Sequence, residues 1–182
     1  LRYLKKIFYN SVAELRIIIF MQNELRAKGF SGFITFQELI KDSTLIPSQK
    51  GVYIVLRENM EKPHFMPKGT GGFFKQKDPN IAIAELEKKW VDNSSILYIG
   101  KAGGENNRAT LKSRIEQYIK FGQGKPIGHK GGRYIWQLAD AHSLIVCWKT
   151  LSEEDPREVE SQMIQEFKKE HEGKRPFANL KD

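Results

Sequence analysis

GVYIVL at residues 51–56 and SILYIGKA at residues 95–102 are the stretches that decide the fold of this 182-residue chain. Both are apolar runs rich in β-branched residues, the pattern of β-strands. Each run places a tyrosine, Tyr53 or Tyr98, close to a glycine, and glycine lets another group approach the backbone. A tyrosine on a strand is most often a core residue whose hydroxyl finds a backbone partner, so the meaning of this pair depends on the rest of the chain.

The bulk composition is that of a soluble globular protein. The chain is long enough for one domain with a sizeable core, and 40% of its residues are hydrophobic and 29% charged. No apolar run approaches the roughly 20 residues of a membrane span. The longest candidate, residues 15–21, contains Arg16. No secretory signal is visible, so we expect a cytoplasmic protein without membrane association.

Cysteine and histidine usage argues against disulfides and zinc. Cys147 is the only cysteine, which excludes an intramolecular disulfide and favours a reducing compartment. It lies in a strand-like run, where a free cysteine acts as a small hydrophobe. The four histidines are scattered, and no pair has the spacing of zinc ligands. We therefore expect no structural zinc.

Positive charge is concentrated in one part of the chain. The net charge is +8, and residues 101–134 carry eight Lys or Arg against Glu105 and Glu116. A concentrated basic stretch suits a polyanion such as a nucleic-acid backbone. A solvated basic surface explains the charge equally well.

Local signals predict the other elements. Apolar residues at helical spacing predict a helix over residues 3–28, with Gly29 as its stop signal. Residues 33–40 fit a short strand or a helical turn. The remaining expectations are a Gly- and Pro-rich loop over residues 57–80, a helix over 80–91 with Asn80 as N-cap, a helix over 107–121, a glycine-rich basic loop over 122–133 and a strand over 144–148.

The last helix has the clearest start signal. Asp155 is the expected N-cap, Pro156 fits the first helical position, and Glu158 would complete a capping box. Glu160 follows on the edge of the apolar face of this helix. A carboxylate there needs a partner such as a metal ion or a base, and a structural salt bridge is the alternative.

Arg114 and Tyr118 lie one helical turn apart in LKSRIEQY and therefore face the same way. An arginine and a tyrosine on one side of a helix could orient a phosphate. The alternative is a surface arginine that packs its stem over the ring. Lys101 follows Tyr98 closely, although a single lysine is most often solvated.

Five motifs in this order resemble the GIY-YIG endonuclease family. They are GVY at 51–53, YIGKA at 98–102, Arg114 in SRIEQY, Glu160, and PFAN at 176–179. YIGKA with a downstream Arg-x-x-x-Tyr is most similar to the catalytic domain of the bacterial nucleotide-excision-repair incision subunit. The resemblance covers about residues 47–181. In the family a short hairpin usually joins the first two strands, so residues 57–94 resemble an insertion.

The resemblance implies an α+β fold with a three-stranded antiparallel sheet flanked by helices. The nuclease-like domain would comprise residues 47–182, and residues 1–46 would form an N-terminal helical extension. It also implies a prokaryotic, nucleoid-associated enzyme that hydrolyses phosphodiester bonds in DNA with Mg²⁺ or Mn²⁺, RNA not being excluded. The alternative is a catalytically weak nucleic-acid-binding or interaction module of the same fold.

The resemblance also assigns roles to residues. Glu160 would bind the metal, Arg114 would stabilise the transition state, and Tyr53 or Tyr98 would activate water, with Lys101 favouring the phenolate. Tyr118 occupies the place of a further family site residue, and we expect Asn179 to be structural, like Gly51 and Gly100. The cations expected to position the nucleic-acid backbone are Lys112, Lys120, Lys125, Lys130 and Arg133.

Overall fold

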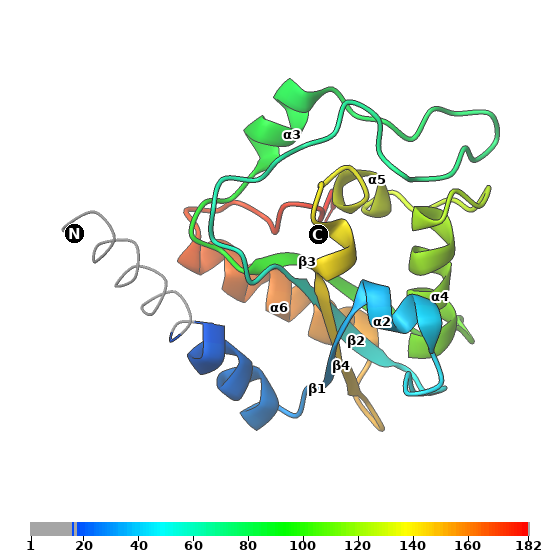
Figure 1. Ribbon diagram of the computed structural model, residues 1–182. Helices are drawn as coiled ribbons and strands as arrows, with labels where there is room; N and C mark the ends of the chain where they lie inside the picture. Colours follow the sequence, from blue (N-terminus) through cyan, green and yellow to red (C-terminus); the bar gives the residue numbers. More distant parts are fainter. Residues whose placement is uncertain (1–15, 17, 182) are drawn as a thin grey trace.

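The computed structural model describes residues 16 and 18–181, and its centre is a four-stranded antiparallel sheet (Figure 1). The order of the strands is β1 (Ser31–Thr35), β4 (Ile145–Thr150), β2 (Gly51–Leu56) and β3 (Ile96–Ala102). The α+β class and the antiparallel pairing are as expected. Within the described residues, none of the helices combines the length and hydrophobicity needed to cross a lipid bilayer.

The expectation of three strands is wrong, because the ambiguous segment 33–40 contains parts of both a strand and a helix. β1 pairs with β4 and ends at Thr35, where α2 (Phe36–Lys41) begins. The Thr35 side chain accepts a hydrogen bond from the Glu38 amide, and the Glu38 carboxylate accepts one from the Thr35 amide. This capping box ends the strand and starts the helix within one residue.

Residues 57–94, the segment expected to be an insertion and called the insertion from here on, separate β2 from β3, and the two strands still pair. Tyr53 lies opposite Gly100, and Val55 lies opposite Tyr98. All six residues of β2 are buried, because the strand is central and both faces of the sheet are covered. Since side chains alternate along a strand, this register places Tyr53 and Tyr98 on the same face of the sheet.

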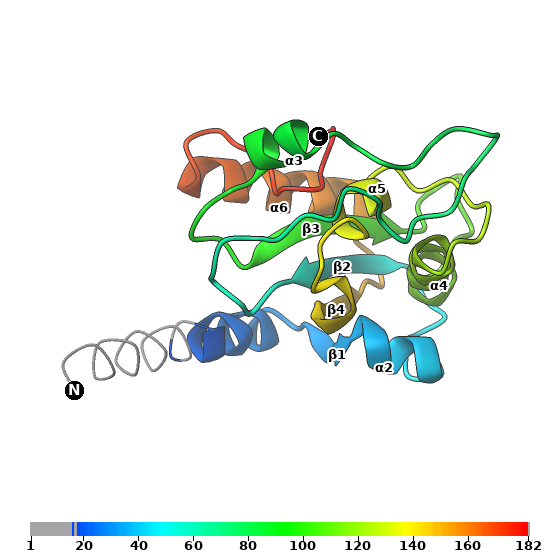
Figure 2. The same ribbon diagram turned by 45° about the horizontal axis from the view of Figure 1, so that its top comes forward.

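Different helices cover the two faces (Figure 2). Tyr53 and Val55 pack into a core with α2 and α4 (Leu111–Gly122). Residues of β2 that point the other way form a second core with the helix over residues 18–27 and with α6 (Pro156–Glu170). Two short helices, α5 (Gly132–Ile135) and the 3-10 turn η1 (Ala141–Ser143), lie between α4 and β4 along the chain.

Capping agrees with the sequence in part. The N-terminal helix ends before Gly29, whose φ of +90° is a conformation that favours glycine. Residues 3–15 and 17 of the expected helix lie outside the described residues. Asp155 caps α6, but its carboxylate accepts from the Arg157 amide, so the capping box expected with Glu158 is not the cap observed.

The helix of the insertion, α3 (Ile83–Lys89), is shorter than expected and begins after Ala82. Asn80 is not its N-cap. The Asn80 side chain instead accepts a hydrogen bond from the Gly69 amide across the preceding loop. Its oxygen is therefore engaged with the loop and does not cap the helix.

Residues 57–80 of the insertion form an extended loop that lies across α5 (Figure 2). Backbone hydrogen bonds attach it to the domain: Met66 donates to the Gln137 carbonyl, Thr70 to the Trp136 carbonyl and Gly72 to the Phe121 carbonyl. The buried Gln137 side chain bonds the amide and the carbonyl of Ile81. The loop therefore has a fixed path over the rest of the domain.

Candidate active site

The two tyrosines of the strand motifs lie side by side. The ring centroids of Tyr53 and Tyr98 are 5.9 Å apart, and the ring of Tyr118 from α4 lies 5.6 Å from that of Tyr98. Tyr53 and Tyr118 are buried, whereas Tyr98 is partly exposed. The structure thus forms a cluster of three phenols from β2, β3 and α4.

One buried hydroxyl of this cluster is unpaired. Among the described residues, the Tyr118 hydroxyl has no hydrogen-bond partner, whereas the Tyr53 hydroxyl interacts with that of Tyr98. Buried polar groups are nearly always paired, so an unpaired buried hydroxyl is a costly feature that suggests a functional reason. Burial raises the pKa of Tyr53 and of Tyr98, and the positive charge of Arg114 opposes the rise in both.

Arg114 lies on the exposed side of the same cluster. It precedes Tyr118 by one turn of α4, and its Nη1 donates a hydrogen bond to Gln117 Oε1 at 2.7 Å. Its charge acts on the pKa values of Tyr53, Tyr98 and Glu160. A single guanidinium therefore acts on both strand tyrosines and on the carboxylate of α6.

Glu160 reaches the cluster from α6. Its Oε2 atom lies 3.3 Å from Lys101 Nζ, and the two side chains are 19% and 32% exposed. Burial raises the pKa of Glu160, and the charges of Lys101 and, more weakly, Arg114 lower it. Glu160, Tyr98, Lys130 and Asn179 together line a cavity of about 210 Å³.

The motif glycines and Asn179 shape the strands. Gly51 lies against the Lys149 carbonyl of the neighbouring strand, where a Cβ would have no room. Asn179 Oδ1 accepts from the Ile99 amide at 2.9 Å, and its Nδ2 donates to the Ile99 carbonyl at 2.8 Å. This asparagine pairs with the backbone at the edge of β3 next to Tyr98.

His129 belongs to the site and was missed by sequence reasoning. Its ring stacks on Tyr118 with centroids 3.9 Å apart and lies 6.1 Å from the ring of Tyr98. Its Nδ1 accepts a hydrogen bond from the Gly132 amide, so in the neutral ring Nε2 carries the proton, and this buried atom has no partner among the described residues. Burial, followed by the charge of Arg114, lowers the pKa of His129 to about 3.

The cations expected to contact nucleic acid differ in their surroundings. Lys125 and Lys130 are exposed, Lys112 is half-buried, and Lys120 lies 3.7 Å from Glu116 on the surface of α4. Arg133 is different, because its guanidinium donates to the carbonyls of residues 78–80 in the insertion. Its observed contacts are structural rather than those of a cation free to bind phosphate.

The described side chains offer few ligands for a metal ion. Across residues 16 and 18–181, no group of three or more His, Cys, Asp or Glu side chains could enclose an ion. Glu160 is the carboxylate beside the tyrosines. One carboxylate suits Mg²⁺, which keeps several waters and completes its shell with phosphate oxygens of a substrate.

The chain matches no protein-family model, no curated protein and no solved structure at a significant level. The site geometry and the order of the sequence motifs are therefore the grounds for a functional assignment.

Proposed function

We propose that this protein is a metal-dependent endonuclease that hydrolyses phosphodiester bonds in DNA, as the resemblance to GIY-YIG nucleases implies. One observation carries the proposal: Tyr53, Tyr98 and Glu160 all lie within the electrostatic influence of Arg114, beside a cavity lined by Tyr98 and Glu160. Titratable groups with shifted pKa values around a cavity are typical of catalytic sites. Cations at such a cavity attract an anionic substrate.

Arg114 would bind the scissile phosphate. Gln117 Oε1 accepts a hydrogen bond from its Nη1, which restrains the side chain. A guanidinium fixed in this way can donate paired hydrogen bonds to phosphate oxygens and stabilise the charge that grows in the transition state.

Tyr98 is the better placed of the two strand tyrosines to take a proton from the attacking water. It lines the cavity, whereas Tyr53 is fully buried. Burial raises the pKa of Tyr53 well above its usual range, and nearby Tyr98 raises it further. Tyr53 therefore stays neutral while Tyr98 ionises first. The Glu160 charge opposes the Tyr98 phenolate, and the Tyr53 hydroxyl and Arg114 favour it.

Glu160 would hold Mg²⁺ or Mn²⁺, which supplies stabilisation of the charge on the leaving oxygen. The carboxylate must be deprotonated for this, and Lys101 and Arg114 favour the deprotonated form. Lys101 keeps the carboxylate oriented toward β3 through their 3.3 Å ion pair.

The same ion pair favours the second candidate function, a nucleic-acid-binding module with weak catalysis. A lysine beside Glu160 competes with a metal for this carboxylate. Such a module would bind DNA in a salt-dependent way without turnover.

A plasmid-nicking assay separates the two functions. Supercoiled plasmid is incubated with the wild type, with Glu160→Gln and with Glu158→Gln, in Mg²⁺, Mn²⁺ or EDTA. Glu158 is an exposed acid of the same helix and serves as the matched control. We expect the wild type and Glu158→Gln to nick the plasmid with Mg²⁺ or Mn²⁺ but not in EDTA. With metal present, Glu160→Gln should nick at least about a hundredfold more slowly. Equal nicking by Glu160→Gln, or no nicking by the wild type with either metal, contradicts the nuclease.

A further inference from the structure

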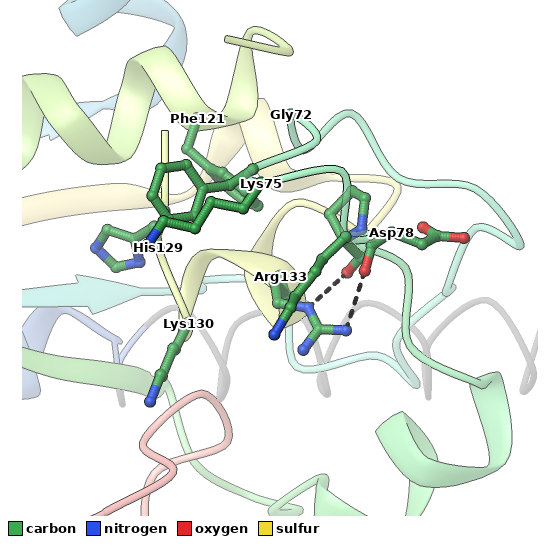
Figure 3. Close-up of a pocket in the computed structure, with 11 residues that line it drawn as sticks. Gly72, Lys75, Asp78, Phe121, His129, Lys130 and Arg133 are labelled. Carbon is green, nitrogen blue, oxygen red and sulfur yellow. Dashed lines mark hydrogen bonds between the residues drawn. The ribbon is translucent and has the colours of Figure 1, made fainter. Parts of the chain in front are cut away.

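A second and larger pocket lies next to the candidate active site (Figure 3). Its volume is about 590 Å³, and it is lined by residues between 72 and 79 of the insertion, by Phe121 of α4 and by residues between 128 and 133. We call it the insertion pocket. Lys130 lines both this pocket and the smaller cavity of Tyr98 and Glu160.

Close packing and hydrogen bonds hold the walls of the insertion pocket in place. Gly72 lies against the Lys125 backbone so closely that a Cβ would have no room, and a Cβ at Gly128 would lie 2.9 Å from the ring of Phe74. Arg133 donates to the carbonyls of Pro79 and Asp78, which Figure 3 shows as dashed lines. The insertion and the basic loop are therefore joined at several points around the pocket.

The lining combines aromatic surfaces with positive charge. Phe74 is 41% exposed, and the rings of Phe121 and His129 belong to the same pocket. Lys75, Lys77 and Lys130 add exposed ammonium groups. The single acid of the lining, Asp78, already accepts hydrogen bonds from Asn80 through Oδ1.

We propose that the insertion pocket receives one unstacked base of a DNA strand whose neighbouring phosphate lies at Tyr98 and Glu160. This inference depends on the proposed function, whose substrate it specifies further. A base needs an aromatic face on which to stack, and its phosphates need cations around the pocket. His129 lies between the two sites, because its ring lines the insertion pocket and stacks on Tyr118 of the tyrosine cluster.

The chemistry of the lining favours recognition by stacking rather than by base identity. Stacking accepts every base, since each has an aromatic face. The preferred substrate is thus DNA with an unpaired or displaced nucleotide, because extruding a paired base costs a few kcal/mol and an unpaired base avoids most of that cost.

Binding in EDTA tests the inference without turnover. Fluorescence anisotropy compares a duplex that carries one unpaired adenine with a duplex that carries an abasic nucleotide at the same position. We expect the wild type to bind the unpaired adenine about five- to hundredfold more tightly, the range for stacking of one base on an aromatic ring. Equal affinity for the two duplexes overturns the proposal.

Three variants locate the effect. Phe74→Leu keeps the apolar volume but removes the aromatic face, and it should abolish the preference for the unpaired adenine. Phe74→Tyr retains the face and should keep the preference. Phe73→Leu is the matched control, because Phe73 is 57% exposed but does not line the pocket. A preference that survives Phe74→Leu, or one that Phe73→Leu removes equally, overturns the assignment.

The two proposals fail in different ways. Glu160→Gln should keep the full preference for the unpaired adenine in EDTA, since Glu160 does not line the insertion pocket. A preference without any nicking by the wild type contradicts only the nuclease. Nicking without the preference contradicts only the pocket. Displacement of the labelled duplex by free dAMP as readily as by unlabelled duplex would make this a mononucleotide site and would also overturn the proposal.

Discussion

A Cβ atom at Gly100 would lie 2.6 Å from Cζ of Tyr53, the residue opposite it on the neighbouring strand. The same Cβ would lie 2.7 Å from Cε1 of Tyr98. Gly100 is therefore the position at which the two phenols are able to meet. Neither ring can keep its place once a side chain is present there, because buried rings have few alternative positions.

Gly100→Ala is expected to impair the site more than the fold. Overpacking of this kind costs about 1–3 kcal/mol of stability, whereas displacement of a reacting group by about 1 Å can cost a hundredfold in rate. Nicking rates and urea unfolding of the same preparation check this. A variant that is less stable but nicks at the wild-type rate would show that the spacing of the two phenols is not required.

Tyr98→Phe should change the pH dependence of nicking. Burial raises the pKa of Tyr98, so only a small fraction is phenolate at neutral pH, and that fraction grows about tenfold per pH unit below the pKa. We expect the wild-type rate to rise with this slope above neutral pH, and Tyr98→Phe to be slow and to lose the slope. Tyr53→Phe should keep the slope. An unchanged slope in Tyr98→Phe would exclude this tyrosine as the base.

Removal of Lys101 should shift the acid side of the same profile. The Lys101 charge lowers the pKa of Glu160, which burial raises. In Lys101→Met the carboxylate holds its proton to higher pH, so the pH at which nicking begins should move upward. The exposed Lys62 is a suitable control, and Lys62→Met should leave that pH unchanged. A downward shift in Lys101→Met would mean that relief from competition for the metal is the larger effect.

His129 should make the folded protein acid-sensitive. Its pKa falls from 6.5 to about 3 on folding, so the unfolded chain binds a proton in this range that the folded protein does not. Its contribution to the free energy of unfolding should therefore decrease by about 1.4 kcal/mol for each pH unit below 6.5. Urea unfolding from neutral pH down to about 5 checks this above the range in which carboxylates titrate.

His129→Gln is expected to be less stable at neutral pH and to show a flatter dependence on pH. His142→Gln, at an exposed histidine, should keep the wild-type dependence. Identical slopes for His129→Gln and the wild type would show that the buried ring does not titrate as described.

Alanine variants of Arg133 and Lys130 should differ, because Arg133 holds the insertion in place and Lys130 is free to contact substrate. Arg133→Ala removes the hydrogen bonds to the carbonyls of residues 78–80 and should expose the insertion to limited proteolysis. Lys130→Ala should leave proteolysis unchanged and reduce the slope of log binding constant against log salt by about 1. Equal protease resistance of Arg133→Ala and the wild type would mean that these hydrogen bonds do not hold the loop.

Strong local signals predicted much of the fold. The expected strand over residues 51–56 is confirmed residue by residue, and Asp155 caps α6 as expected. The extra strand β1 was missed because FITFQEL switches from strand to helix at Thr35, and short apolar runs of this kind fit both. The expected asparagine cap was wrong because a distant amide, that of Gly69, competes for the same side chain.

The candidate site shows a different limit of the sequence. Motif order named Tyr53 and Tyr98 but could not rank them, because the burial of each depends on the helices packed around the sheet. His129 has no periodic signal, and only the glycines at 128, 131 and 132 pointed to close packing nearby. Its positive charge made Arg133 a candidate to contact nucleic acid. In the folded protein its guanidinium instead donates hydrogen bonds to backbone carbonyls, which the sequence does not reveal.

The pairing of β1 with β4 has a consequence for how the chain is made. Ser31 and Trp148 are 117 residues apart in sequence yet adjacent in the sheet, and no pairing in the sheet joins strands linked by a tight turn. Contacts so distant in sequence form slowly, because a large loop must close before they stabilise anything. A nascent chain released before residue 145 has no β4 to join β1 to β2. The four-stranded sheet is therefore completed only after β4 has left the ribosome, whereas β2 and β3 can pair before β4 is made.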